Sequence, residues 1–182
     1  TLAKADNTVT LTFTSNEAIA TPTVTFTSGS PAQAATNDDV VANPGDGNTY
    51  TATYTVDTDD TDGAVGFSIS FSDTAGNAGV AVTAVTDSSG VTVDNTAPVI
   101  TLTGNNPQTV ERLTSYSESS ATVADDIDQN AQDTLTIDSS NVNTSVSGSY
   151  SVTYDATDAA GNAAQQVTRT VIVEDTTAPT LT

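Results

Sequence analysis

Two phrases occur twice in this chain, and their repetition constrains the fold more than any other feature. Ser-Asp-Thr-Ala-Gly-Asn-Ala-Gly at 72–79 is followed by Val-Asp-Asn-Thr-Ala-Pro at 93–98. The second copies are Thr-Asp-Ala-Ala-Gly-Asn-Ala-Ala at 157–164 and Glu-Asp-Thr-Thr-Ala-Pro at 174–179. The copies lie roughly 80–90 residues apart, which is the length of a small domain. The sequence therefore predicts two tandem domains, residues 1–95 and residues 96–182, that meet at the first junction phrase.

Apolar residues alternate with polar ones through most of both domains, and helical periodicity is nearly absent. Val9, Leu11 and Phe13 alternate with threonines, and Tyr150, Val152 and Tyr154 alternate in the same way in the second domain. A period of two places the apolar side chains on one face of a strand. Short strands of this kind, separated by turns rich in Gly, Asn and Asp, predict an all-β fold of antiparallel β-sandwiches placed end to end.

The composition excludes several functions. The chain has 23 acidic residues and only three basic ones, for a net charge of −20, whereas nucleic acids and anionic membrane surfaces require clustered Lys or Arg. There is no Cys, His, Met or Trp, which excludes disulfides, thiolate metal sites and His-based catalysis. No apolar run is long enough for a transmembrane helix. We therefore expect no nucleic-acid binding, no membrane insertion and no enzymatic activity.

The acidic residues gather in loops, and tracing the strands up and down predicts where these loops lie. In the first domain the tracing places Glu17, the acidic loop 57–62 and Asp94 at the end that meets the junction, with the turn 73–77 at the opposite end. In the second domain it places residues 125–128 and the turn 158–162 at the end that faces the junction. Acidic loops of both domains are thus expected at one junction.

Several carboxylates held close together repel one another unless a cation neutralises them. Carboxylate, amide and backbone carbonyl oxygens are ligands for hard divalent ions, and Ca²⁺ accepts six to eight of them in loose geometry, whereas Mg²⁺ demands a tight octahedron. We therefore predict Ca²⁺ as the bound ion. The candidate ligands are Glu17, Asp59, Asp62, Asp73, Asn77, Asp94, Asn95, Asp125, Asp126, Asp128, Asp158, Asn162 and Asp175.

Some of these residues have an alternative interpretation. The repeated turns, with Asp73, Asn77 and Asn162, could be hairpin turns in which Asp accepts backbone N–H groups and Gly-Asn provides a positive φ. The loop 57–62 could be a solvated acidic loop. Residues 126–130 begin like an EF-hand loop, but the Gly and the terminal Glu of that motif are missing and no helices flank it. We reject the EF-hand.

The junction phrase at 94–98 resembles the linker of cadherins, in which Asp-Asn-Ala-Pro joins successive extracellular modules through calcium. By this resemblance Glu17 and the loop 57–62 occupy the places of the Glu and the Asp-rich loop of the preceding module, and Asp126 and Asp128 those of the Asp-x-Asp of the following one. The combination of the repeated turn and the Asp-x-Thr-Ala-Pro junction is more similar still to bacterial immunoglobulin-like repeats. These repeats form the stalks of giant surface adhesins, many exported by type I secretion.

The resemblance implies two immunoglobulin-like or cadherin-like sandwiches at the bacterial cell surface, in an RTX-type adhesin that acts in cell adhesion and biofilms. Its implied function is a calcium-stiffened extender that projects a distal ligand-binding domain. The partners would be neighbouring repeats of the same chain, and the isolated fragment would be a monomer. Two alternatives stay open: a module that itself binds a glycan, ice or a partner cell, and a cadherin-like homophilic module.

Overall fold

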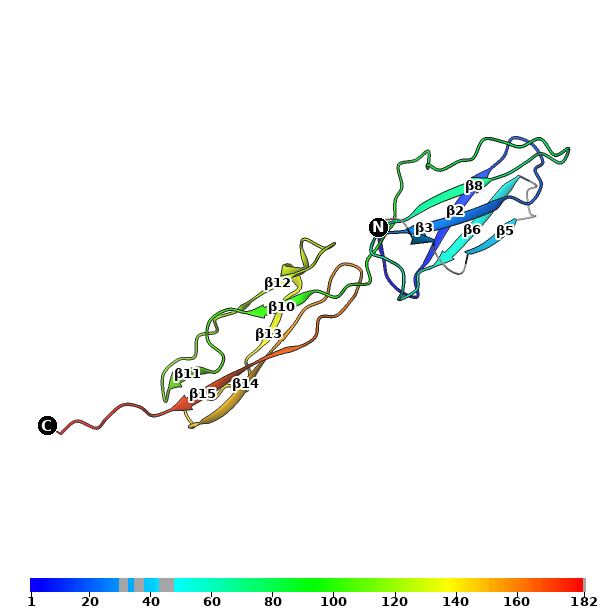
Figure 1. Cartoon of the computed structure of the whole chain (residues 1–182). Helices are drawn as coiled ribbons and strands as arrows, with labels where there is room; N and C mark the ends of the chain where they lie inside the picture. Colours follow the sequence, from blue (N-terminus) through cyan, green and yellow to red (C-terminus); the bar gives the residue numbers. More distant parts are fainter. Residues whose placement is uncertain (30–32, 35–37, 43–47, 182) are drawn as a thin grey trace. The chain divides into compact units, whose positions relative to one another are not determined.

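The computed structural model describes residues 1–29, 33–34, 38–42 and 48–181, with side chains for residues 1–29 and 48–181 (Figure 1). It divides into two compact units, unit 1 (Thr1–Asn95) and unit 2 (Thr96–Thr182). In the described part of the chain, all regular structure is β-strand except for one short 3₁₀ helix, η1 (Ala131–Thr134). The prediction of an all-β fold is confirmed.

The described residues of unit 1 form nine strands in three small sheets. The strands are β1 (Leu2–Ala3), β2 (Thr8–Thr14), β3 (Thr23–Ser28), β4 (Gln33–Ala34), β5 (Asp38–Ala42), β6 (Thr49–Thr55), β7 (Gly63–Ala64), β8 (Gly66–Ser70) and β9 (Thr92–Val93). The sheet orders are β2-β6-β5, β4-β3-β8 and β1-β9-β7. All pairings are antiparallel except β1 with β9, which is parallel.

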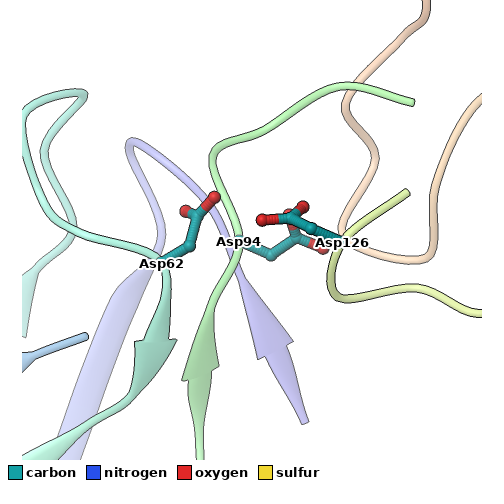
Figure 2. Close-up of side chains that lie close together, drawn as sticks. All are labelled: Asp62, Asp94 and Asp126. Carbon is teal, nitrogen blue, oxygen red and sulfur yellow. The ribbon is translucent and has the colours of Figure 1, made fainter. Parts of the chain in front are cut away.

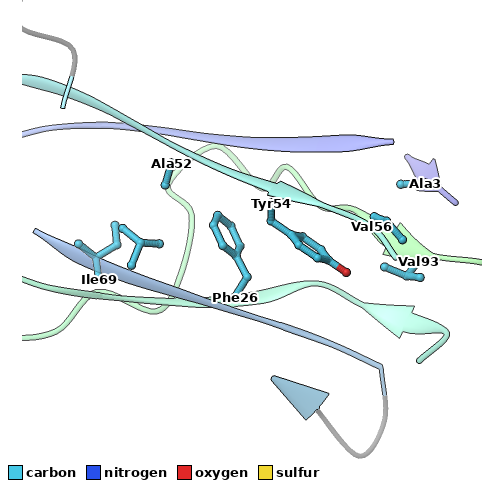
Figure 3. Close-up of a cluster of buried hydrophobic side chains, with 8 residues drawn as sticks. Ala3, Phe26, Ala52, Tyr54, Val56, Ile69 and Val93 are labelled. Carbon is cyan, nitrogen blue, oxygen red and sulfur yellow. The ribbon is translucent and has the colours of Figure 1, made fainter. Parts of the chain in front are cut away.

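The core of unit 1 is built from the inward positions of these alternating strands. Ala52, Tyr54 and Val56 follow one another along and just beyond β6, and each is fully buried (Figure 3). The Tyr54 ring stacks on Phe26 of β3, with the ring centroids 5.6 Å apart. Figure 3 shows these side chains directed into one interior, which explains why the threonines between them face outward.

In the described part of unit 2, up to residue 181, six strands form two sheets. The strands are β10 (Val99–Leu102), β11 (Gln108–Glu111), β12 (Ala121–Ala124), β13 (Thr136–Asp138), β14 (Gly148–Asp155) and β15 (Val167–Glu174). β10 pairs with β12, and the larger sheet has the order β11-β15-β14-β13. β11 runs parallel to β15, as β1 does to β9 in unit 1, and the other pairings are antiparallel.

Arg169 of β15 is a charged side chain within the core of unit 2, where it occupies an inward position between valines and is fully buried. Its guanidinium donates to the backbone carbonyls of Thr103 (2.6 Å), Asn105 (2.5 Å) and Ser120 (3.0 Å) and to the Tyr154 hydroxyl (2.8 Å). A buried charge is tolerated only when it is hydrogen-bonded and paired. Arg169 therefore connects β15 to the segment that follows β10 and to the segment that precedes β12.

The counter-ion of Arg169 is Glu118, whose carboxylate lies 3.3 Å from the guanidinium. The hydroxyls of Tyr116 and Tyr154 also donate to this carboxylate. Burial by itself would raise the pKa of Glu118, but these hydrogen bonds and the Arg169 charge hold the pKa below its usual value. Burial and the hydrogen bond to Glu118 raise the pKa of Tyr154. Tyr154, like Tyr54 in unit 1, is fully buried.

Candidate functional site

At the C-terminal end of unit 1, Asn95 organises the acidic loop. Its side-chain amide donates to the carbonyls of Asp57 (2.9 Å) and Asp60 (3.2 Å), and its Oδ1 accepts the Ala5 N–H (2.7 Å). Its own backbone N–H donates to Asp62 Oδ1 (2.6 Å). These contacts hold the predicted ligands Asp62 and Asn95 at the end of β9, although the Asn95 Oδ1 already accepts a hydrogen bond from the Ala5 N–H.

Asp62 and Asp94 form a carboxylate pair within unit 1. The register that pairs Gly63 with Val93 brings the residues just before β7 and just after β9 opposite each other, as Figure 2 shows. One carboxylate oxygen of Asp62 lies within 4.8 Å of one of Asp94. Asp94 is fully buried, and Asp62 is half-buried. Like charges directly opposite each other on a ladder are destabilising, so the pair favours binding of a cation.

The other acids of the loop 57–62 do not share this arrangement. Asp59 is exposed. The Asp60 carboxylate accepts the Tyr54 hydroxyl (2.6 Å), the Asp57 N–H (2.6 Å) and, more weakly, the Ser28 hydroxyl (3.4 Å). Asp60 therefore satisfies the buried Tyr54 hydroxyl, a role that sequence reasoning missed because nothing distinguishes this Asp from its neighbours in sequence.

The predicted position of Glu17 is wrong. Antiparallel pairing of β2 with β6 places Thr14 beside Thr49, so the segment after β2 lies at the opposite end of unit 1 from the loop 57–62. The error arose because the two-residue strand β1 gives no periodic signal. β1 runs toward the junction end and β2 runs back, which reverses the direction assumed for β2. Glu17 lies beside the turn 73–77, with which it lines a groove described below.

The turn 73–77 lies at that far end, as predicted, and its polar groups bond to one another. Asp73 Oδ1 accepts the N–H groups of Ala75 (2.9 Å) and Asn77 (2.8 Å), and its Oδ2 accepts the Asn77 side-chain amide (2.6 Å). The hydrogen bonds from Asn77 and Ala75 lower the pKa of Asp73. For Asp73 and Asn77 the structure thus has the features of the hairpin-turn alternative.

At the N-terminal end of unit 2, the loop after β12 and the turn 158–162 lie together, as the strand tracing predicts. Asp125 Oδ1 accepts the N–H groups of Ile127 (3.0 Å) and Asp128 (2.7 Å). Its Oδ2 is buried and accepts no hydrogen bond from the described residues. One Asp125 oxygen lies within 4.8 Å of one of Asp158, which forms a second carboxylate pair. Asp126 is exposed at the tip of the loop.

Asp128 connects this loop to the turn. The residue is nearly buried, and its two oxygens accept the N–H groups of Asn130 and Ala159, each at 2.9 Å. Asp158 Oδ1 accepts the N–H groups of Gly161 and Asn162, both at 2.7 Å. The Asn162 amide donates to Asp158 Oδ2 (2.7 Å) and weakly to the Thr96 carbonyl (3.4 Å). The predicted ligands of unit 2 thus also form a hydrogen-bonded scaffold.

Asp175 lies at the other end of unit 2, where it is exposed and 3.9 Å from the Arg112 guanidinium. Asp175 matches Asp94 in the repeated phrase, but the two residues do not occupy equivalent positions relative to the strands. Asp94 directly follows the buried Val93, and in unit 2 the residue that directly follows the buried Val173 is Glu174. Asp175 is one position further along the chain.

The fold and these loops define a class: all-β, immunoglobulin-like modules with acidic ends. Residues 100–173 match the family described as bacterial surface protein, Ig-like domain, a match that covers less than half of the chain and lies within unit 2. No curated protein sequence matches the chain.

Two solved structures are similar at low identity. The fibronectin(III)-like modules of CbhA from Clostridium thermocellum have 16% identity over 96% of this chain and 89% of theirs, with a TM-score of 0.40. The tandem Ig domains of titin have 13% identity over 96% of this chain and 92% of theirs, with a TM-score of 0.31. Among the described residues, no helix has the length and apolar character needed to cross a membrane.

Proposed function

We propose that this chain is a non-catalytic spacer of a bacterial surface adhesin, in which Ca²⁺ stiffens the junction of two immunoglobulin-like units. The family match to residues 100–173 supports the surface location. The observation that carries the calcium proposal is the Asp62–Asp94 pair, in which a fully buried carboxylate lies within 4.8 Å of a second one. Removing a carboxylate from water beside a like charge is costly, and a divalent cation offsets that cost.

The ligand chemistry favours Ca²⁺ over other ions. The Asp62–Asp94 and Asp125–Asp158 pairs offer only oxygen atoms, and the chain contains no His or Cys. Such a ligand set excludes a typical Zn²⁺ site, and loops that also bond to their own backbone suit the flexible coordination of Ca²⁺. Backbone carbonyls and water would complete the coordination shell.

The chain connectivity supports a shared site. Asn95 fixes the acidic loop of unit 1, and the next residue, Thr96, accepts a hydrogen bond from the turn of unit 2. No residues intervene between these two anchors. Ions held by both carboxylate pairs would restrict bending at the Asn95–Thr96 junction, and the repeated phrase at 174–179 suits an array of such junctions.

The proposal predicts a calcium-dependent shape. Small-angle scattering in excess Ca²⁺ should give a longer maximum dimension and a narrower distribution than scattering in EGTA. For extracellular sites with dissociation constants of about 10⁻⁴–10⁻³ M, a hundredfold excess of Ca²⁺ stabilises the folded state by about 2.7 kcal/mol.

The matched variants are Asp94→Asn and Asp73→Asn. Asp94→Asn should abolish most of the calcium response in scattering and in calorimetric titration. Asp73→Asn changes the same residue type at the far end of unit 1 and should leave the response unchanged. Identical scattering with Ca²⁺ and EGTA in the unmodified chain would contradict the proposal.

A further inference from the structure

Unit 1 has an open sheet edge. β2 pairs with β6 on one side, and no strand of the described residues pairs with its other side. β2 is seven residues long and contains no Pro, Lys or bulge, the features with which proteins usually protect an edge. An unprotected edge is a template for one more strand.

The register identifies the backbone groups that face this edge. The Ser15 N–H bonds to the Asn48 carbonyl and the Val56 N–H to the Asn7 carbonyl, so odd-numbered residues of β2 make the hydrogen-bonded pairs with β6. The N–H and C=O groups of Thr8, Thr10, Thr12 and Thr14 therefore point away from β6. These are the groups that an added strand would pair with.

A groove runs along this edge. The groove, of about 950 Å³, is lined by the second half of β2, by Phe67 and Phe71 on or next to β8, and by Val82 and Val85 of the segment that leads to β9. A separate, smaller hollow of about 380 Å³ lies beside Thr8 and Val9 and is also lined by β1. Leu11 and Phe13 are only half-buried, so the groove exposes the edge of the core.

In unit 2 the corresponding edge is occupied. β11 runs parallel to the last strand of its unit and precedes β12, as β1 runs parallel to β9 and precedes β2. β12 thus corresponds to β2, and its outward edge pairs with β10, whose Ile100 is buried in the core. The Thr103 N–H bonds to the Ser120 carbonyl, so even-numbered residues of β12 face β10, and their side chains are exposed like the threonines of β2.

We propose that the groove along β2 binds an antiparallel strand of the β10 type, supplied by the junction segment of another immunoglobulin-like repeat. The segment has Thr-Ala-Pro followed by alternating apolar and Thr residues, as residues 96–103 do. It is uncharged, which suits a groove lined by Glu17, Asp73 and Asp87. An apolar side chain at the position of Ile100 covers Leu11 and Phe13.

The identity of the strand as part of another repeat rests on the proposed function, an array of repeats. The groove itself does not involve calcium. Neither Asp62 nor Asp94 lines it. Strand binding should therefore be the same in Ca²⁺ and in EGTA, so the two proposals fail separately.

The test is an NMR titration of the isotope-labelled chain with a capped peptide of residues 96–104, Thr-Ala-Pro-Val-Ile-Thr-Leu-Thr-Gly. Saturable shifts should be confined to residues 8–14 and to the groove segment around Val82 and Val85, with slower amide exchange at Thr10 and Thr12. Two control peptides alter only the ligand and not the protein. One has Asp in place of Ile100 and Leu102, and the other is N-methylated at the Thr101 amide. Each control peptide should have a dissociation constant at least roughly tenfold higher. The first cannot cover the apolar side chains of the core, and the second lacks an N–H group for hydrogen bonding to β2.

A fusion gives a second measurement. Placing a copy of residues 96–107 directly ahead of Thr1 supplies the strand in cis and should slow amide exchange throughout unit 1 but not unit 2. Self-association of the chain that is lost on truncation after Asp175 would also support the proposal, because the exposed segment 177–181 carries the same phrase. Equal shifts with all three peptides, or a fusion with unchanged exchange in unit 1, would overturn it.

Discussion

The two Asp-x-Ala-Gly-Asn turns have similar internal hydrogen bonds in different surroundings. In both, the Asp carboxylate accepts two turn N–H groups and the Asn side-chain amide, and Gly76 and Gly161 have the same φ of 93°. The Asp158 side chain is buried and its turn bonds to Asp128, whereas Asp73 is only half-buried and residues 74–77 are exposed. The local sequence therefore determines the conformation of the turn, and the surrounding residues determine how much the turn contributes to the stability of its unit.

The largest expected difference comes from removing the Asp of each turn. Asp158→Ala removes a buried carboxylate that accepts three partly buried hydrogen bonds and should destabilise unit 2 by about 2–3 kcal/mol. Asp73→Ala should cost unit 1 clearly less, because water replaces the lost acceptor. Amide exchange resolved by unit measures both values. Equal losses would show that burial does not distinguish the turns.

Asp128→Asn breaks the contact that only the second turn has. The variant retains one acceptor oxygen, but its NH₂ group faces a backbone donor, so we expect a loss of about 1–2 kcal/mol in unit 2. Exchange at Ala159 should accelerate, because its N–H donates to Asp128. Unit 1 is the internal control and should not change.

Gly76→Ala tests the feature that the turns share. A Cβ at this position would meet no atom within 4 Å, so the cost is that of the positive φ alone, about 1 kcal/mol. Gly161→Ala should cost a similar amount of backbone energy. Denaturant unfolding followed by a probe in each unit measures the two costs, and a much larger loss for Gly161 would show that its surroundings add a steric term.

The smallest effect is the pH dependence of the exposed turn. Hydrogen bonds from Asn77 lower the pKa of Asp73 in the folded state. The stabilisation is therefore fully present above the ordinary Asp pKa and is lost as the pH falls through the lower, folded value. An NMR titration of the Asp73 carboxyl and the Asn77 amide should give one shared midpoint below the ordinary value. Asp73→Asn should remove that transition from the Asn77 amide.

Prediction from the sequence was successful where the signal is local. Alternation located the main strands, and the repeated phrases located the turns and the acidic ends. The error for Glu17 came from β1, which is only two residues long and whose Leu2 and Ala3 pair with the distant Thr92 and Val93 of β9. The roles of Asp60, Asp128 and Arg169 depend on which donors and carbonyls tertiary folding brings to them. One acidic residue among 23, or one Arg between valines, gives no warning of such a role.

The parallel pairing of β11 with β15 has a mechanical consequence. β11 lies near the start of unit 2 and β15 near its end, with four residue pairs from Gln108–Val171 to Glu111–Glu174. A pulling force applied to the two ends loads these hydrogen bonds in shear, so they must rupture together rather than unzip in turn. Hydrogen bonds from Arg169 to backbone carbonyls also connect β15 to the segment just before β11. The pairing of β11 with β15 is thus expected to make unit 2 resist extension by a force applied to its two ends.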